Sequence, residues 1–346
     1  MKKIVITGCA GFIGSHLTRH FLQNGDRVIG VDNLSRRGSE ANLDWIGEIK
    51  RGEFVFSKID IRDYRALEKV CRSEGPFDLV IHQAAQVAVT SSVINPRFDF
   101  EVNALGTFNV LEATRAISPD AFFEFASTNK VYGKMEGTAV VERNRRYEYE
   151  HLENGVDEST PLDFHSPYGC SKGSADQYVR DYSRIYGIRS VVLRQSCIYG
   201  TRQFGVEDQG WVAWFSIAAT LGKRITIYGD GKQGRDLLWI DDLVAAYDGL
   251  FRCADRTAGN IYNVGGGSRN ILSLLELVAI LKDEKILRGD PVFDAWRPGD
   301  QRIFVCDTRK LEKDINWQVL TEPRDGVKKL LEWCRENVGL LQAILE

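Results

Sequence analysis

The first 32 residues constrain the fold of this chain more than any other part of the sequence. Residues 2–7, KKIVIT, form a short apolar run rich in β-branched side chains, which predicts a buried strand. A turn with Gly8, Gly11 and Gly14 follows, then a helical pattern, then a second strand that ends at Asp32. Such glycines allow a tight turn and let a pyrophosphate approach the backbone at a helix N-terminus. This order predicts a dinucleotide-binding unit that opens a parallel, doubly wound α/β sheet.

The acid at the end of the second strand indicates which dinucleotide binds. Asp32 can accept hydrogen bonds from the ribose hydroxyls of the adenosine, and it would repel a 2′-phosphate, so NAD is favoured over NADP. Arg36 and Arg37 lie just beyond and keep NADP open as the alternative. The other alternative is a glycine-rich turn that binds nothing. The cofactor contacts predicted in this unit are Gly8, Gly11, Phe12, Ile13, Gly14, Asp32 and Asn33.

The alternation of strands and helices continues along the chain. Further strands are predicted at residues 54–60, 77–82, 121–127 and 190–196, and helices at residues 64–73 and 97–117. Ala84 and Ala85 follow a strand, where small residues let a cofactor approach the backbone. Asp60 and Ile61 are predicted to contact the adenine, although Asp60 could instead cap the next helix. Asn103, in the long helix, is the remaining predicted cofactor contact.

Tyr168 and Lys172 form the candidate catalytic pair. In a helix they lie one turn apart on the same face. The lysine ammonium favours the tyrosinate, so we expect the pKa of the Tyr168 phenol to fall towards neutral pH. The phenol could then take a proton from a substrate hydroxyl as hydride leaves the same carbon. The alternative is an ordinary helix start with Pro167 in its first turn, but the pair lies downstream of a dinucleotide-binding unit.

The second half of the chain is less regular. Residues 201–215 mix aromatic and polar side chains and are predicted to line a pocket, residues 259–268 to form a strand and turn, and residues 271–282 and 324–337 to form helices. Residues 134–159 are polar without a clear period, which predicts an irregular loop. We therefore expect an NAD-binding domain over residues 1–187. Residues 188–346 would mainly form a smaller α/β substrate domain, with some segments that return to the first sheet.

Composition excludes several classes of protein. The chain has 346 residues and a formal net charge of −3, which gives no reason to expect nucleic acid or a membrane surface as a partner. Its seven cysteines are dispersed without metal-ligand spacing, so we predict reduced thiols and no metal. The sequence begins with a strand rather than a signal peptide, and no apolar run approaches the ~20 residues of a membrane span. A cytoplasmic protein is expected.

Several motifs occur in a fixed order across nearly the whole chain. They are the glycine turn, Asp32, Thr128, the Tyr168–Lys172 pair and GDGKQGRD at residues 229–236. In this order the sequence resembles the extended short-chain dehydrogenases/reductases of the nucleotide-sugar epimerase/dehydratase type, which implies a Rossmann sheet and NAD. Four segments most resemble the 2-epimerases that act on CDP-hexoses. They are residues 127–133, 157–178, 198–215 and 299–307.

The resemblance implies a role for each matching residue. Thr128 would hydrogen-bond the reacting hydroxyl, Tyr168 would act as acid and base, and Lys172 would hold the nicotinamide ribose and tune the tyrosine. Arg235 and Arg297 would lie near the nucleotide diphosphate, as bidentate phosphate binding requires. For both arginines the alternative is a surface salt bridge.

Two departures from the family pattern limit the reaction. Dehydratases of this type have Asp-Glu directly after the threonine, whereas this chain has Asn129 and Lys130, which counts against 4,6-dehydration. Many 4-epimerases have an asparagine three residues after the arginine that corresponds to Arg194, whereas this chain has Cys197. The loss of that amide predicts a substrate pose unlike that of the common 4-epimerase.

The predicted reaction inverts C2 of a CDP-hexose through a transient 2-keto sugar, as from CDP-paratose to CDP-tyvelose or from CDP-glucose to CDP-mannose. The alternatives are a UDP-sugar 4-epimerase, a net dehydrogenase or reductase, and a non-enzymatic NAD-binding regulator. The predicted substrate contacts are Thr128, Asn129, His165, Gln209, Arg235 and Arg297, although a lone histidine such as His165 is more often structural. Helices at residues 97–117 and 171–186 occupy the places where this family forms a dimer interface, so a homodimer or homotetramer is expected.

Overall fold

The computed structural model describes residues 1–297 and 301–345. Its centre is a seven-stranded parallel sheet in the order β12-β8-β5-β4-β1-β2-β3. The chain reverses its direction of winding between β1 and β4, as a doubly wound sheet requires. The strands are β1 (Lys3–Thr7), β2 (Arg27–Asp32), β3 (Glu53–Lys58), β4 (Leu79–His82), β5 (Phe122–Thr128), β8 (Arg189–Gln195) and β12 (Ile261–Val264). The predicted Rossmann-type sheet is confirmed.

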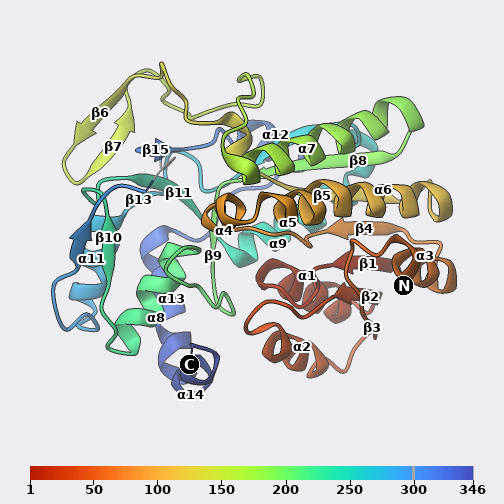
Figure 1. Cartoon of the computed structure of the whole chain (residues 1–346), viewed down its shortest axis with the longest axis horizontal. Coiled ribbons are helices and arrows are strands. Elements are labelled where there is room, and N and C mark those ends of the chain that lie inside the picture. Colours follow the sequence, from red (N-terminus) through yellow and green to blue (C-terminus); the bar gives the residue numbers. More distant parts are fainter. Residues whose placement is uncertain (298–300, 346) are drawn as a thin grey trace.

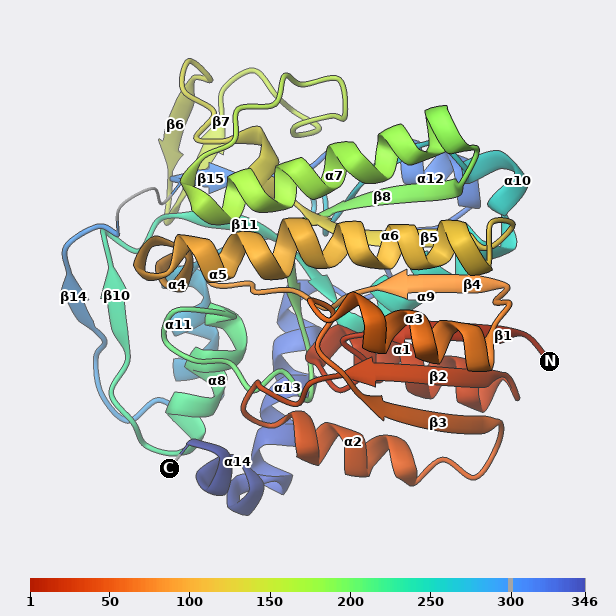
Figure 2. The ribbon, with the colours of Figure 1, turned by 45° about the vertical axis from the view of Figure 1, so that its right-hand side comes forward.

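Helices cover both faces of this sheet (Figures 1 and 2). In β1, Ile4 and Ile6 belong to one apolar cluster and Val5 to another, because neighbouring side chains of a strand point to opposite faces. Both faces are buried, as in other parallel sheets. The first face packs against α1 (Phe12–Gln23) and α9 (Ile240–Arg252), and the second against α3 (Tyr64–Glu74), α6 (Gly106–Ile117) and α7 (Ser166–Tyr186).

Shorter elements form a second region beside the carboxyl end of the large sheet. One sheet has four strands, β9 (Cys197–Tyr199), β11 (Gly234–Trp239), β13 (Ile271–Ser273) and β15 (Ile303–Phe304). A separate parallel pair consists of β10 (Thr226–Tyr228) and β14 (Val292–Asp294). The helices of this region are α8 (Trp211–Thr220), α11 (Leu274–Asp283), α13 (Pro323–Glu336) and α14 (Val338–Leu345). The remaining helices are α2 (Ser39–Gly47), α4 (Val89–Ile94), α5 (Pro96–Phe100), α10 (Ala254–Thr257) and α12 (Arg309–Ile315), with a 3-10 turn at Asn129–Tyr132.

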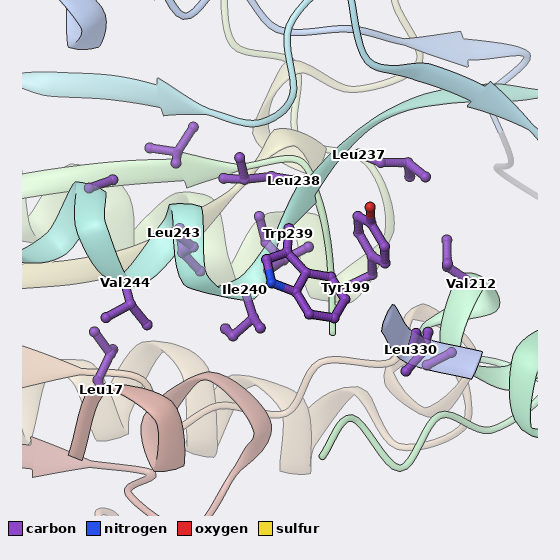
Figure 3. Packing of buried hydrophobic residues seen from close by; sticks show 14 of the residues in the cluster. Leu17, Tyr199, Val212, Leu237, Leu238, Trp239, Ile240, Leu243, Val244 and Leu330 are labelled. Carbon is purple, nitrogen blue, oxygen red and sulfur yellow. The ribbon is translucent and has the colours of Figure 1, made fainter. Parts of the chain in front are cut away.

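One apolar cluster joins the two regions (Figure 3). The rings of Tyr199 and Trp239 meet edge to face at 5.4 Å, between Leu17 of α1 on one side and Leu330 of α13 on the other. Burial of these large side chains fixes the second region on the first. The boundary between domains at residue 187 stays a prediction.

The structure corrects three local expectations. Residues 134–159, expected to be irregular, contain an antiparallel hairpin of β6 (Val140–Arg143) and β7 (Arg146–Tyr149). The segment expected to be helical from residue 271 begins as β13, and the helix starts only after Ser273, which forms a capping box with Glu276. The long helix at residues 97–117 is interrupted by a π turn, Glu101–Leu105, between α5 and α6.

None of the helices in the described part of the chain combines the length and the apolar character that crossing a membrane requires.

Candidate active site

A cavity of about 390 Å³ lies at the carboxyl ends of the central strands. This is the place where doubly wound sheets bind their ligands. Fourteen of the predicted site residues line it, namely Gly8, Gly11, Phe12, Ile13, Gly14, Asp32, Asn33, Asp60, Ile61, Ala84, Ala85, Tyr168, Lys172 and Gln209. The cavity therefore brings the dinucleotide motif and the tyrosine–lysine pair into one site.

The glycine turn leaves room for a ligand at the backbone. Gly8 has φ +71°, and an added Cβ would lie 2.7 Å from the backbone nitrogen of Ala84, so only glycine fits there. A Cβ on Gly14 would overlap the carbonyl oxygen of Gly8. Helix α1 begins at Phe12, and no side chain caps its first N–H groups. These free donors at a helix N-terminus fit the pyrophosphate of a dinucleotide.

The acid at the end of β2 is held by the backbone. Asp32 Oδ2 accepts from the N–H of Ala10 at 3.0 Å, and Oδ1 accepts from the N–H of Leu34 at 2.8 Å. Burial raises the pKa of Asp32, and these hydrogen bonds to the ionised form partly offset that rise. The carboxylate is thereby fixed on the cavity wall where the adenosine ribose was predicted to bind.

Asp60 lies on the same wall and does not cap a helix. Its oxygens accept from Arg62 Nε at 3.0 Å and Nη2 at 2.9 Å, and from Asn33 Nδ2 at 2.9 Å. The hydrogen bonds from Arg62 lower the pKa of Asp60 to about 2. Helix α3 is capped by Asp63 instead, whose side chain accepts from the N–H of Ala66. The capping alternative for Asp60 was therefore wrong.

The loop after β2 meets residues 203–209 across the cavity. Arg36 Nη2 donates to Gln209 Oε1, and the ring of Phe204 packs against Gly38 so closely that a Cβ there would overlap it. Gln209 thus reaches the cavity beside the loop that follows Asp32. Its predicted contact with the substrate stays a prediction.

The catalytic candidates meet where β5 ends and α7 begins. Thr128 is the last residue of β5, and its side chain lies close enough to the Tyr168 phenol to affect the pKa of that phenol. Ser166, the first residue of α7, has φ +65°, an uncommon conformation for a residue other than glycine, and its hydroxyl accepts from the N–H of Gly169 at 3.2 Å. This turn, followed by Pro167, sets the direction in which α7 presents Tyr168.

The predicted fall in the pKa of Tyr168 is not found. Burial raises this pKa to about 12, and hydrogen bonding to Thr128 offsets only part of the rise. Burial also lowers the pKa of Lys172 to about 7, so its charge is weakened. Lys172 Nζ donates to the carbonyl oxygen of Ala126 at 2.5 Å and lies 4.4 Å from the ring centre of Phe125. In the protein alone, desolvation outweighs the attraction that the sequence predicts.

Asn103, Asn129 and His165 lie outside the cavity lining. Asn103 is buried. Its Oδ1 accepts a hydrogen bond from the backbone N–H of Gln86, and its Nδ2 donates one to the carbonyl of Gln86, each at 2.9 Å. Asn129 is buried at the start of the 3-10 turn, where its Oδ1 accepts from Thr128 at 3.4 Å. His165 is half-buried directly before α7 and does not cap it. Direct ligand contacts of these three residues stay predictions.

The two predicted diphosphate-binding arginines lie in the second region. Arg235 is on β11 and donates from Nη1 to the carbonyl of Gly234 at 2.7 Å. Arg297 Nη2 lies 3.0 Å from Asp208 Oδ1, and its guanidinium lies 4.0 Å from the ring centre of Tyr228. Neither arginine lines the cavity, and their role in substrate binding stays a prediction.

Sequence reasoning missed two glutamines. Gln83 and Gln195 line the cavity at the ends of β4 and β8, and each donates from Nε2 to the hydroxyl of Tyr247 at 2.6 Å. Gln83 directly precedes the alanines that were noted, so its position was a usable signal. Their shared partner, Tyr247, comes from α9 and could not be found from local sequence.

The sheet, the glycine turn, the acid on β2 and the Thr–Tyr–Lys cluster together define the class of extended short-chain dehydrogenases/reductases. Comparison with known proteins agrees. The model of the NAD dependent epimerase/dehydratase family matches residues 4–265, and the chain belongs to that family. NAD is its cofactor, and the predictions of this family, this cofactor and an isomerase are confirmed.

The relatives include both epimerases and dehydratases. The chain is 43% identical over 340 residues to the CDP-paratose 2-epimerase of Salmonella typhi, covering 96% of this chain and 98% of the relative. It is 34% identical over 334 residues to a putative UDP-glucose 4-epimerase of Methanocaldococcus jannaschii, covering 96% and 99%.

Solved structures show the same architecture. The UDP-glucose 4-epimerase of Thermotoga maritima with UDP-glucose has a TM-score of 0.82 at 30% identity, with 97% of this chain and 99% of that chain covered. The dTDP-glucose 4,6-dehydratase DesIV of Streptomyces venezuelae, with NAD and TYD bound, has a TM-score of 0.83 at 29% identity, with 99% of each covered.

Proposed function

We propose that this protein is a nucleotide-sugar epimerase that inverts C2 of a CDP-hexose. The observation that carries the proposal is the cluster of Thr128, Tyr168 and Lys172, of which the last two line the dinucleotide cavity. The choice of C2 and of a CDP-sugar is supported by the 43% identity to a CDP-paratose 2-epimerase. CDP-paratose and CDP-glucose are the candidate substrates.

The residues present do not support dehydration. Removing water across two carbons requires an acid and a base beside the tyrosine, where this chain has Asn129 and Lys130. Lys130 Nζ donates to Gln301 Oε1 at 3.2 Å, and Gln301 in turn donates to the carbonyl of Gly133. An amide and a lysine at these places leave the tyrosine as the proton acceptor of the cluster.

In the proposed mechanism, Tyr168 removes the proton of the C2 hydroxyl while Thr128 holds that hydroxyl. The glycine turn and Asp32 would hold NAD, which would supply a hydride acceptor and donor for C2, so that hydride could return to the opposite face of the flat 2-keto sugar. Tyr168 then gives the proton back to the oxygen. Because burial raises the pKa of Tyr168 to about 12, its ionisation requires added positive charge, which we propose that Lys172 and bound oxidised NAD would supply. The keto sugar must present its opposite face to the cofactor while the diphosphate stays bound. We propose that Arg235 and Arg297 hold the diphosphate.

Proton NMR of the purified protein tests the proposal. The protein, without added NAD, is incubated with CDP-paratose and separately with CDP-glucose. Inversion at C2 in either sample, giving CDP-tyvelose or CDP-mannose, is the expected result. Inversion at C4 of a UDP-hexose, with no change in the CDP-sugars, would overturn it in favour of a 4-epimerase, the second candidate, which the 34% identical relative favours. NAD binding without turnover of any sugar nucleotide would indicate a regulator. Formation of one NADH for each substrate molecule consumed would indicate a dehydrogenase.

We propose a homodimer through the outer faces of α5, α6 and α7. In Figure 2, α5 and α6 follow one another along one rod that runs beside α7. The three helices expose large apolar side chains, among them Phe100 at 56%, Ile185 at 66% and Tyr186 at 53%. Phe108 of α6 meets Tyr178 of α7 edge to face at 5.9 Å. An exposed apolar surface across three helices is typical of an interface between copies.

Light scattering tests this assembly. The wild type is expected to be a dimer or tetramer, and Phe108→Glu to dissociate it because the charge would be buried at the interface. Leu320→Glu is the matched control, since Leu320 is also apolar and is 74% exposed outside these helices. A monomeric wild type, or dissociation by both variants alike, would contradict the proposed interface.

A further inference from the structure

A carboxylate on α5 lies buried beside the catalytic helix. Asp99 is 0% exposed. Its Oδ1 accepts from Gln86 Nε2 at 2.8 Å and from Asn103 Nδ2 at 3.1 Å, and its Oδ2 accepts from Ser171 Oγ at 2.5 Å. Ser171 lies between Tyr168 and Lys172 on α7, and Gln86 lines the cavity. Asp99 therefore connects the cavity wall, the π turn and the catalytic helix.

The charge of Asp99 is not balanced by its own hydrogen-bond partners. All three donors are neutral. Asp176, the other buried acid near Lys172, is different. It accepts from Arg194 Nε and Nη2, both at 3.0 Å, and from Ser127 at 2.7 Å, so it forms a buried ion pair. A buried carboxylate with neutral partners needs a cation near by, since isolated buried charge is costly.

Lys172 is the cation that meets this need. It is 4% exposed, and its Nζ hydrogen-bonds a backbone carbonyl rather than a carboxylate. Burial lowers its pKa, and the charges of Asp176 and Asp99 act in the opposite direction. Asp176 has the larger effect of the two, but it is shared with Arg194, whereas the hydrogen-bond partners of Asp99 include no cation.

We propose that Asp99 is a positioning residue of the active site: its buried carboxylate keeps the Lys172 ammonium charged and, through Ser171 and Gln86, fixes the catalytic helix against the cavity wall. The inference rests on the roles proposed above for Tyr168 and Lys172. It adds a residue outside the motifs described above.

The titratable groups around this pair are few. On α7 they are Tyr168, which Asp99 affects directly, and Asp176, which is paired with Arg194 of β8. On β4 there is His82, whose pKa burial lowers to about 3, with the charge of Lys172 adding to the effect. His82 is therefore neutral at the pH of any activity assay. Asp99 raises the pKa of both Tyr168 and Lys172, so removing its charge lowers both.

The test compares pH–rate profiles of the holoenzyme. Asp99→Asn keeps the shape of the side chain and removes its charge. We expect the whole profile to move to lower pH by about one unit, the shift that a near charge produces in a protein. At a fixed pH on the alkaline limb of the profile, kcat should therefore fall by about tenfold with KM little changed. Ser171→Ala, which removes a hydrogen bond and keeps the charge, should lower kcat without moving the profile.

A second measurement needs no substrate. The lowered pKa of Lys172 makes the unfolded state bind more protons between about pH 7 and the ordinary lysine pKa of 10.5, so the thermal midpoint gains from this group as pH rises through that range. In Asp99→Asn this gain should begin about one pH unit lower. In Lys172→Met the rise of the thermal midpoint over this pH range should be absent, which shows that the rise comes from Lys172.

The outcomes separate this inference from the proposed function. The inference would be overturned if the pH–rate profile of Asp99→Asn had the same pH dependence as the wild type and its thermal midpoint rose over the same pH range. Asp99 would then be a purely structural residue. Absence of turnover in the wild type, with the thermal shift present, would overturn the proposed function and support the inference. If Asp99→Asn fails to fold, Asp99→Ser, which is also neutral and smaller, must give the same shift.

Discussion

The two walls of the active site are built in different ways. The cofactor wall comes from consecutive elements, β1 to β4, and largely from backbone, with Gly8 and Gly14 at the turn and Ala84 opposite. The wall towards the second region comes from segments far apart in the chain and from side chains, such as Phe204 against Gly38 and Gln195 against Tyr247. A backbone site depends on small residues at fixed places, whereas a side-chain site can be altered one residue at a time.

We propose a separate function for each wall. Every member of a cofactor family needs the same turn, so its pattern is local and recurs. Substrate choice requires side chains that differ between relatives, so they lie on segments whose partners are distant. The following substitutions test whether the two walls can be changed independently.

The largest effect is expected at Tyr168, where the walls meet. Tyr168→Phe removes the phenol hydroxyl beside Thr128 and should lower kcat by about 10³-fold, as loss of a general base does. The NAD content of the purified protein, read by absorbance after denaturation, should not change. Tyr178→Phe is the matched control on the same helix, since Tyr178 is 49% exposed, and it should retain full turnover. Near-full turnover in Tyr168→Phe with NAD bound would refute the acid/base role.

A methyl group on the backbone wall should act on the cofactor. In Gly14→Ala the new Cβ overlaps the carbonyl of Gly8, so the turn must open. We expect NAD affinity to fall by more than about tenfold, the factor that ~1.4 kcal/mol represents. Gly47→Ala is the control, because a Cβ there meets nothing within 4 Å. Unchanged NAD content in Gly14→Ala would show that the cofactor does not bind against this turn.

A substitution in the second region, outside the cavity lining, should act on the substrate alone. Arg235→Ala removes a candidate diphosphate ligand and should raise KM by about tenfold, as loss of a charge-assisted hydrogen bond does. Bound NAD and kcat should stay close to wild type. The control is Arg143→Ala, whose side chain is 66% exposed on the hairpin. Equal KM values in both variants would leave Arg235 as a structural residue.

The smallest effect concerns stability. Lys172→Met removes a buried cation whose pKa is lowered to about 7, and which is therefore unfavourable to folding while it stays protonated. The penalty is complete below about pH 7 and shrinks as pH rises towards the unfolded value of 10.5. We expect the melting temperature of Lys172→Met to exceed that of the wild type by about 3 °C at pH 6, with the difference shrinking at higher pH. A lower melting temperature at pH 6 would indicate that packing, not charge, dominates at this position.

Sequence patterns predicted the parts that depend on neighbours along the chain. The turn from Gly8 to Gly14 and the one-turn spacing of Tyr168 and Lys172 are local, and both came out as expected. The hairpin at β6 and β7 was missed because its alternation is weak, and β13 because its partner Arg235 lies more than thirty residues earlier.

Charge effects were the least predictable part of the site. The pKa of Tyr168 depends on how deeply α7 is buried and on Asp99, which no motif connects to the tyrosine. Spacing along a helix gives the distance between two side chains. It does not give the desolvation that decides their charge.

The π turn at Glu101–Leu105 makes the number of residues in this segment important for the site. A π turn holds one residue more than an α turn, so it rotates everything before it relative to everything after it. That rotation lets Asp99 and Asn103 face α7 while Val110 and Leu111, farther along the same rod, stay in the apolar layer over the sheet. We expect that deleting a single residue here would straighten the rod and turn Asp99 away from Ser171. We therefore expect this segment to be sensitive to insertions and deletions as well as to replacements.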